Sequence, residues 1–238
     1  MGHQRTIRRF AKWHIWLGWL VGVPILMWTV TGLVMVAKPI EEVRGNHLRI
    51  EPTNEGFSGN PAPIAFDLDG SPQATEMRSY VQNGRLITAV TRLDGSIDRF
   101  DGASGQPLDG IDEQEARQIV QQGIVGGDKV ASATAFDAND VPFDFRRPMS
   151  VWQVALEDGT HVYVGAETGR IEAVRTRWWR LFDVMWGLHI MDLETREDTH
   201  HPILILFAIL AVIGSLLGCI LMFRRRKARV SAQAKVAT

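Results

Sequence analysis

The sequence predicts a membrane protein of mixed α and β structure, in which two transmembrane helices flank a globular α+β domain. Two observations predict the helices: residues 15–37 and 202–223 are uncharged, mostly apolar runs. A third predicts the domain, because several short strand-like runs separated by turn residues fill the interval between them. The segments expected are 1–40 (basic end and first helix), 41–75 (linker and start of the domain), 76–176 (domain), 177–201 (aromatic juxtamembrane segment), 202–223 (second helix) and 224–238 (basic tail).

The two apolar runs are long enough to cross a bilayer. At ~1.5 Å per residue, the second reaches roughly 33 Å, more than the ~30 Å hydrocarbon core. The first also has the layout of a cleaved signal peptide, with a basic start and a small residue at Ala37. Its apolar region is longer than the roughly 7–15 residues of a signal peptide, and it is rich in tryptophan. We therefore expect an uncleaved anchor.

Charge is segregated along the chain and predicts the topology. Ten of the 26 Lys and Arg residues lie in 1–12 and 224–238, where there is no acid, so 16 basic residues face all 27 acidic ones in between. The positive-inside rule then places both ends in the cytoplasm. We expect a bacterial inner-membrane protein with a periplasmic central domain. Each basic cluster adjoins an apolar run, so nucleic-acid binding is not expected. The single cysteine, Cys219, excludes an intramolecular disulfide.

The central domain reads as mainly β. Strands are expected at 77–81, 85–91, 96–100, 129–136, 150–156, 161–165 and 171–174. Asn83-Gly84 separates the first two runs, and such a pair is a strong hairpin signal. Residues 111–120 have apolar side chains at helical spacing with acids in the first turn, which predicts a helix.

Several stretches resemble the PepSY-associated transmembrane (PepSY-TM) family. Residues 152–171, which read WQVALEDGTHVYVGAETGRI, are similar to a PepSY domain, with Gly165 where Asp is commoner. The stretch from Arg8 to Gly18, the pair Thr31-Gly32, Leu188-His189 and the arginine-rich stop resemble the flanking segments. The resemblance implies haem-b-containing inner-membrane proteins linked to reduction of ferric siderophores, with span histidines as haem ligands. Such relatives generally have more than two spans.

His14 is the sharpest candidate ligand, because an ionisable residue inside a membrane span is a functional hypothesis by default. His14, Gly18 and Gly22 are spaced four apart and share a helix stripe. That stripe suits either a haem lying against small residues or close helix packing. Gly214 and Gly218 repeat the spacing in the second run. Met222 is an alternative axial ligand.

Three further histidines are candidates at the other face: His189, after the aromatic segment, and His200 and His201, before the second span. These lie ~30 Å from His14 across an ordinary bilayer, so one haem cannot bridge them. A second haem would need its own ligands, for example His189 with His200 or His201, or one histidine from each of two subunits. Without a C-x-x-C-H motif, any haem would be bound non-covalently, as haem b.

Two functions of different class remain open. The first is haem-b-dependent electron transfer in the reduction of ferric siderophores for iron uptake, as a component of a ferric-chelate reductase. The second is a non-catalytic, membrane-anchored regulatory or protease-inhibitory module. Two helices offer little surface to enclose a cofactor, so we expect a homodimer or a complex with another inner-membrane protein. Membrane lipid is the other expected partner.

Overall fold

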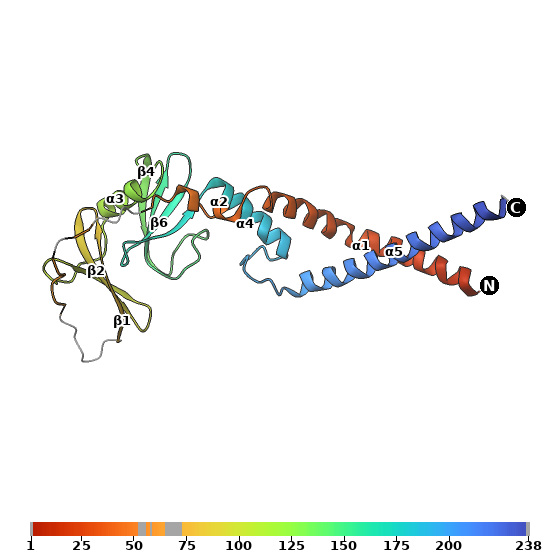
Figure 1. The fold of residues 1–238 in the computed structure, drawn as a ribbon, viewed down its shortest axis with the longest axis horizontal. Coiled ribbons are helices and arrows are strands. Elements are labelled where there is room, and N and C mark those ends of the chain that lie inside the picture. Colours follow the sequence, from red (N-terminus) through yellow and green to blue (C-terminus); the bar gives the residue numbers. More distant parts are fainter. Residues whose placement is uncertain (1, 52–55, 58, 65–72, 237–238) are drawn as a thin grey trace. The chain divides into compact units, whose positions relative to one another are not determined.

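The computed structural model describes residues 2–51, 56–57, 59–64 and 73–236. The chain divides into two units (Figure 1). The central unit is Pro39–Arg180, and the helical unit combines Met1–Lys38 with Leu181–Thr238. The predicted fold class is confirmed, because two apolar helices flank a central region of antiparallel sheets and helices.

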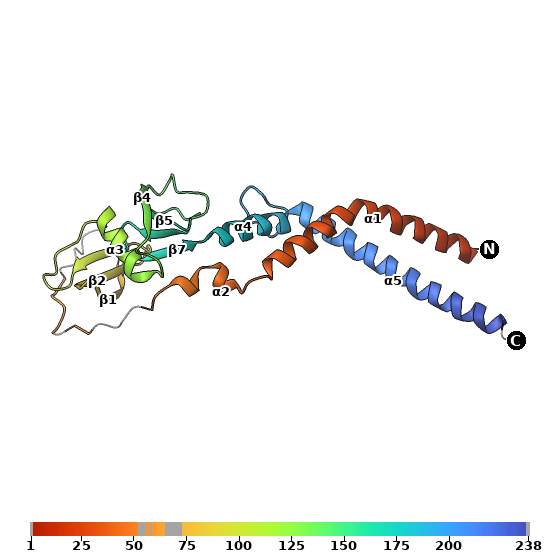
Figure 2. The same cartoon turned by 90° about the horizontal axis from the view of Figure 1, so that it is seen from above.

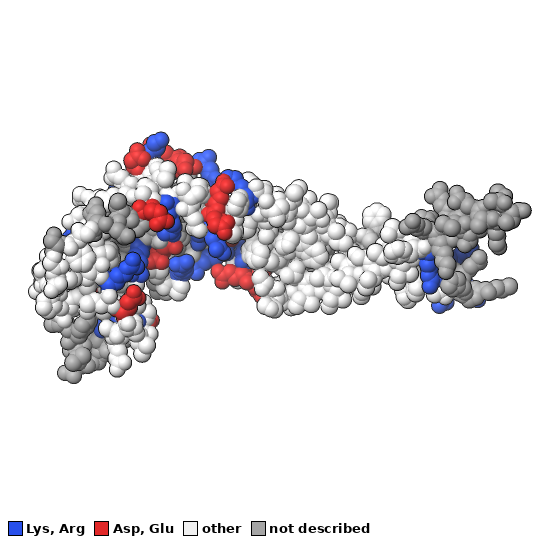
Figure 3. Space-filling model, in the orientation of Figure 1, with Lys and Arg blue, Asp and Glu red and all other residues white. Residues whose placement is uncertain are grey.

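The helical unit is built on α1 (Gly2–Met35) and α5 (Pro202–Val236). Both contain a segment long and apolar enough to cross a membrane, Arg5–Met35 and Pro202–Arg224. Only 11% and 6% of their most apolar windows are buried, so neither resembles the core helix of a soluble protein. Their surface is largely free of charge over this length (Figure 3). The helices are longer than the predicted runs, because each continues through its basic end.

The helices α1 and α5 pack side by side, with both chain termini at one end of the pair (Figures 1 and 2). Their contact uses positions three or four apart on α1. His14 faces Gly214 and Gly218, Leu17 also faces Gly214, and Val21 is buried. Small residues on α5 let the two backbones approach closely, as in other membrane helix pairs.

Half of the central unit is a three-stranded antiparallel sheet in the order β1-β2-β3. Its strands are β1 (Ala74–Gln82), β2 (Arg85–Arg92) and β3 (Ile97–Asp101). Asn83 and Gly84 join the first two strands with φ of 52° and 72°. Positive φ at both central residues matches the twist of the flanking strands and gives the predicted tight hairpin.

The other half is a four-stranded antiparallel sheet, β4-β5-β6-β7, with helix α3 (Glu113–Gly123) packed on it. The strands are β4 (Val130–Phe136), β5 (Val151–Leu156), β6 (His161–Gly165) and β7 (Ile171–Arg175). Asp112 caps α3 by accepting a hydrogen bond from the Glu115 amide. All seven predicted strands and the predicted helix are present, within a few residues of the expected bounds.

A buried arginine joins the two halves of the central unit. The side chain of Arg99, on β3, is 2% exposed and forms an ion pair of 2.5 Å with Glu115 on α3. The same guanidinium donates to Gln82, whose amide donates to the carbonyl of Gly169 in the β6–β7 turn. A charge buried this deeply needs its partner, so these contacts fix one sheet against the other.

Two segments differ from expectation. Part of the predicted linker forms α2 (Ile40–Val43) and the 3₁₀ helix η1 (Asn46–Leu48), where Val43 is buried. Gly45 has φ of 75°, and a Cβ there would lie 2.8 Å from Val174. Residues 52–55, 58 and 65–72 of that linker lie outside the described residues. The aromatic segment after β7 begins with a helix, α4 (Arg177–Ile190).

Candidate functional site

His14 is held in the contact between the two long helices. Its Nδ1 lies 3.0 Å from the carbonyl oxygen of Gly214. A carbonyl can only accept, so Nδ1 carries the hydrogen and donates it. In the neutral imidazole the other nitrogen, Nε2, then has a free lone pair. A backbone carbonyl bound to one ring nitrogen is the usual outer partner of a histidine that binds metal through the other.

Gly218 makes room for the His14 ring. A Cβ at this position would lie 2.9 Å from Cε1 and 3.4 Å from Nε2 of the imidazole. At Gly214, one turn earlier, a Cβ would meet only Leu17, at 3.8 Å, an ordinary contact. Glycine is therefore required next to the imidazole at Gly218 and merely tolerated at Gly214.

His189, near the end of α4, has a matching arrangement. Its Nδ1 lies 2.9 Å from the Thr31 hydroxyl oxygen on α1. That hydroxyl has one hydrogen, which it donates to the Met27 carbonyl oxygen 2.8 Å away. It must therefore accept from Nδ1–H of His189, and Nε2 again keeps its lone pair. The hydroxyl fixes the tautomer of His189 as the carbonyl of Gly214 fixes that of His14.

Two further residues of α1 seat His189. Trp28 donates its indole N–H to the His189 carbonyl oxygen, at 2.8 Å. The ring lies against Gly32, where a Cβ would be 3.6 Å from Cε1. Backbone and ring are thus both attached to the last turns of α1, which fixes the direction of the imidazole.

The loop after α4 is held by one carboxylate. Asp192 accepts hydrogen bonds from the amides of Glu194, Thr195, Glu197 and Asp198 and from the Thr195 hydroxyl. The bond from the Thr195 hydroxyl and those from the amides hold the pKa of Asp192 well below its ordinary value. The loop follows His189 by only two residues, so its rigidity also limits the movement of that histidine.

A second set of contacts packs this loop against α4. Arg196, in the loop, pairs with the buried carboxylate of Asp183 at 2.5 Å. Its carbonyl oxygen accepts from the indole N–H of Trp186. Gly187 lies between them, and a Cβ there would come within 2.9 Å of the Asp192 carbonyl oxygen.

The remaining predicted site residues have other surroundings. A Cβ at Gly18 or Gly22 would meet nothing within 4 Å, so these glycines do not pack against α5. His201 precedes the first residue of α5, and its carbonyl accepts from the Ile205 amide. Its Nδ1 is buried with no hydrogen-bond partner among the described residues. His200 is exposed.

Sequence reasoning did not anticipate the groups that hold the imidazoles. Thr31 was identified only as part of a Thr-Gly pair, and Trp28 only as an interfacial tryptophan. A Thr followed by Gly near the end of an apolar run is a usable signal, because it offers a hydroxyl beside a gap for a ring. The partner position, some 158 residues later, is set by tertiary contact alone.

His14 and His189 lie at two levels of the helical unit. Thr31 follows His14 by 17 positions on α1, which corresponds to about 26 Å at ~1.5 Å per residue. Within the described residues, no group of three or more His, Cys, Asp or Glu side chains could hold a metal ion. Haem iron needs fewer side chains, because the porphyrin supplies four nitrogens and the protein one or two axial ligands. Two separate imidazoles with fixed tautomers fit that role.

The comparisons with known proteins identify the family. No curated protein and no solved structure matches the chain. The model of the PepSY-associated TM region matches residues 11–237, nearly the whole chain, including both long helices and the central unit. The match covers His14, His189 and the residues that position them. The chain therefore belongs to the family of the PepSY-associated TM region, and is a membrane protein of that type.

Proposed function

We propose that this chain is an inner-membrane electron-transfer protein that binds haem b non-covalently through His14 and His189. The observation that carries the proposal is the paired geometry of these imidazoles. Each donates Nδ1–H to an oxygen of the helix it faces, 3.0 Å away for His14 and 2.9 Å for His189, and each keeps Nε2 for a ligand. Such outer hydrogen bonds orient the ring and raise its basicity as a ligand.

The two levels suit passage of electrons across the membrane. Haem supplies reversible one-electron chemistry when it is bound. His14 would hold the group near the basic, cytoplasmic end of α1, and His189 would hold the one near the opposite face. The acceptor we propose is a ferric siderophore or similar chelate on the side of the central unit, so that the protein contributes to iron uptake as a ferric-chelate reductase component.

A homodimer follows from counting ligands. Each chain places one imidazole with a fixed tautomer at each level, whereas bis-histidine ligation needs two. A second copy would provide the missing imidazole at both levels and enclose the cofactor in a bundle of four long helices. The unpartnered surface around Gly18 and Gly22 leaves room for that close approach.

The visible spectrum of the purified full chain tests the proposal. Protein expressed with adequate haem should be red, with a low-spin spectrum that shifts on reduction with dithionite. His14→Ala and His189→Ala should each remove or convert to high spin about half of the haem. His47→Ala is the matched control, because His47 is exposed on η1 in the central unit. Colourless wild-type protein would overturn the proposal and favour a regulatory module.

The proposed topology has its own test. Leu93 lies 72% exposed in the turn between β2 and β3, so a cysteine there can be labelled without disturbing the core. In a Cys219→Ser background, Leu93→Cys should react with a membrane-impermeant maleimide in spheroplasts before lysis. Labelling only after lysis would place the central unit in the cytoplasm and reverse the direction of electron transfer.

A further inference from the structure

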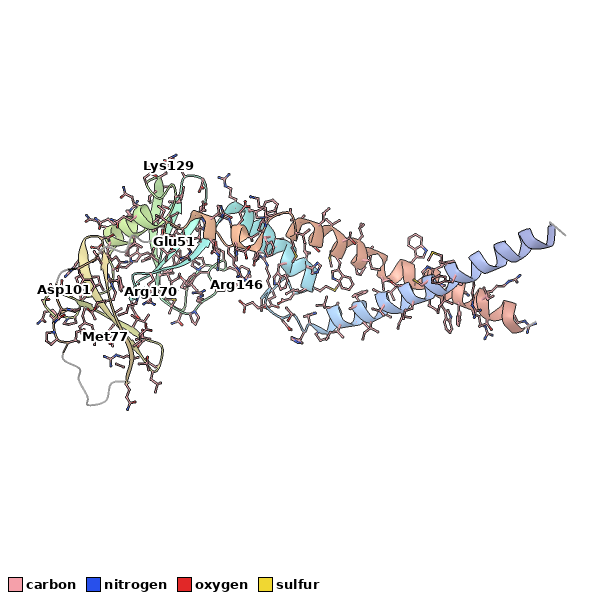
Figure 4. The ribbon with its side chains drawn as sticks, viewed as in Figure 1. Glu51, Met77, Asp101, Lys129, Arg146 and Arg170 are labelled. Carbon is pink, nitrogen blue, oxygen red and sulfur yellow. The ribbon has the colours of Figure 1, made fainter. Side chains whose placement is uncertain are left out.

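An aromatic and arginine-rich patch lies in the central unit where α4 begins. It is formed by the loop between β4 and β5 and the first turn of α4, and consists of Phe143, Arg146, Arg175, Trp179 and Arg180. The guanidinium carbon of Arg175 lies 4.1 Å from the Trp179 ring centroid, and that of Arg146 lies 6.0 Å from the same ring. Figure 4 labels Arg146 on this loop.

The patch combines an exposed apolar ring with positive charge. Phe143 is 50% exposed, and the Arg146 guanidinium lies 4.5 Å from its ring centroid. Arg146 also donates to the Phe143 carbonyl oxygen, which orders the tip of the loop. A phenyl ring held in water beside a cation costs free energy in the absence of a partner, and the interfacial region of a membrane accommodates both groups.

Neutral oxygens, rather than carboxylates, hold the arginines in the floor of the patch. Arg175 donates through Nε to the Asp144 carbonyl, while the Asp144 carboxylate is bound by Tyr163 and His161. Arg180 donates to the carbonyls of Arg175 and Gly159. Neither Arg175 nor Arg180 forms an ion pair within the described part of the chain. Their positions are therefore fixed while their charge stays available to an anion.

The guanidinium groups also repel one another. Burial lowers the pKa of Arg175 below its ordinary value, and the neighbouring charges of Arg147 and Arg146 lower it further, against the opposing effect of Asp144. Arg147 itself pairs with Glu172 at 3.2 Å at the rim. An anion bound between Arg146 and Arg175 would relieve this repulsion.

We propose that this patch binds the phosphate of anionic phospholipid headgroups, with Phe143 inserted at headgroup level. Arg146 and Arg175 would contact the phosphate, and Trp179 would support both guanidinium planes. The chain itself keeps the patch at the membrane, because Arg180 is followed at once by Leu181, the first residue of the helical unit. A soluble phosphate would use the same arginines but would leave the Phe143 ring in water, so the exposed ring favours lipid.

Hydrogen–deuterium exchange of the full chain in nanodiscs tests this inference. Amides of residues 141–147 should exchange more slowly in discs containing phosphatidylglycerol than in discs of phosphatidylcholine alone. One basic side chain strengthens attachment to an anionic surface about five-fold, so Arg146→Gln should reduce the protection by about that factor. Phe143→Ser should reduce it without altering charge. Arg117→Gln is the matched control, since it removes a positive charge from exposed α3.

Each outcome decides the inference. Protection that needs phosphatidylglycerol, is weakened by both patch variants and is kept by the control supports it. Equal exchange in both kinds of disc would overturn it, as would equal loss of protection in the control, which would indicate net charge rather than this patch. Inorganic phosphate added to phosphatidylcholine discs is the remaining arm, and full protection there would assign the patch to a soluble anion instead. Unchanged exchange in β5 and β6 verifies that the variants fold.

Discussion

Replacing Gly218 with alanine should disable the His14 site while leaving the helices intact. The new Cβ would lie 2.9 Å from Cε1 of the imidazole, whereas carbon atoms in contact are ~3.5–4.0 Å apart. The ring must therefore move by about 0.6–1.1 Å. Its hydrogen bond to the Gly214 carbonyl, 3.0 Å long, would then stretch to about 3.5 Å or beyond, where hydrogen bonding is effectively lost.

The expected consequence is weaker haem binding at one of two levels. Loss of the outer partner of a metal-binding histidine costs about 10–100-fold in affinity. Haem titration of reconstituted protein, followed by the Soret absorbance, should show one class of site unchanged and the other weakened by about that factor. Alanine is the better helix former, so the helices themselves should not suffer.

Gly214→Ala is the matched control for this experiment. It makes the same chemical change one turn earlier, but its Cβ would meet Leu17 at an ordinary 3.8 Å. Haem binding should stay within about two-fold of wild type, because a change this small disturbs no hydrogen-bonding side chain. The reasoning is refuted if Gly218→Ala binds haem like wild type although His14→Ala does not. Equal weakening by both alanines would show that general helix packing, rather than the seat of His14, controls binding.

Three further predictions concern other contacts. Thr31→Val removes the acceptor of His189 Nδ1–H and should shift the reduction potential of one haem, whereas Thr31→Ser keeps the hydroxyl and should leave the potential near that of wild type in a spectroelectrochemical titration. Arg99→Met leaves Glu115 without its partner, and should destabilise the central unit by about 2–4 kcal/mol, the lower end reflecting partial hydration of that carboxylate; unchanged urea midpoints would contradict this. Gly187→Ala forces a Cβ against the backbone of the loop after α4, and should increase proteolysis of that loop; wild-type protease resistance would show that the loop can adjust.

Hydrophobic and turn patterns determined the elements of this fold from the sequence. Residues 77–81 and 85–91 alternate side chains across an Asn-Gly pair, and they form the hairpin of β1 and β2 with Asn83 and Gly84 at positive φ. The two spans follow from uncharged runs of sufficient length. The pattern was weakest for α4, because Trp and Phe occur in interfacial loops as well as in helices, and only packing decides between them.

The sequence by itself also identified the histidines that matter, because an ionisable residue in or beside an apolar run is costly and so marks a site. Only the tertiary structure decided how they are held. The partners of His14 and His189 lie some 200 and 158 positions away along the chain, and no local pattern encodes a contact over such distances. The same holds for Gly18 and Gly22: their spacing is visible in the sequence, but which face of a helix meets its neighbour depends on side-chain packing across the whole pair. Here that packing turned His14 toward Gly218 and left the other two glycines unpartnered within the chain.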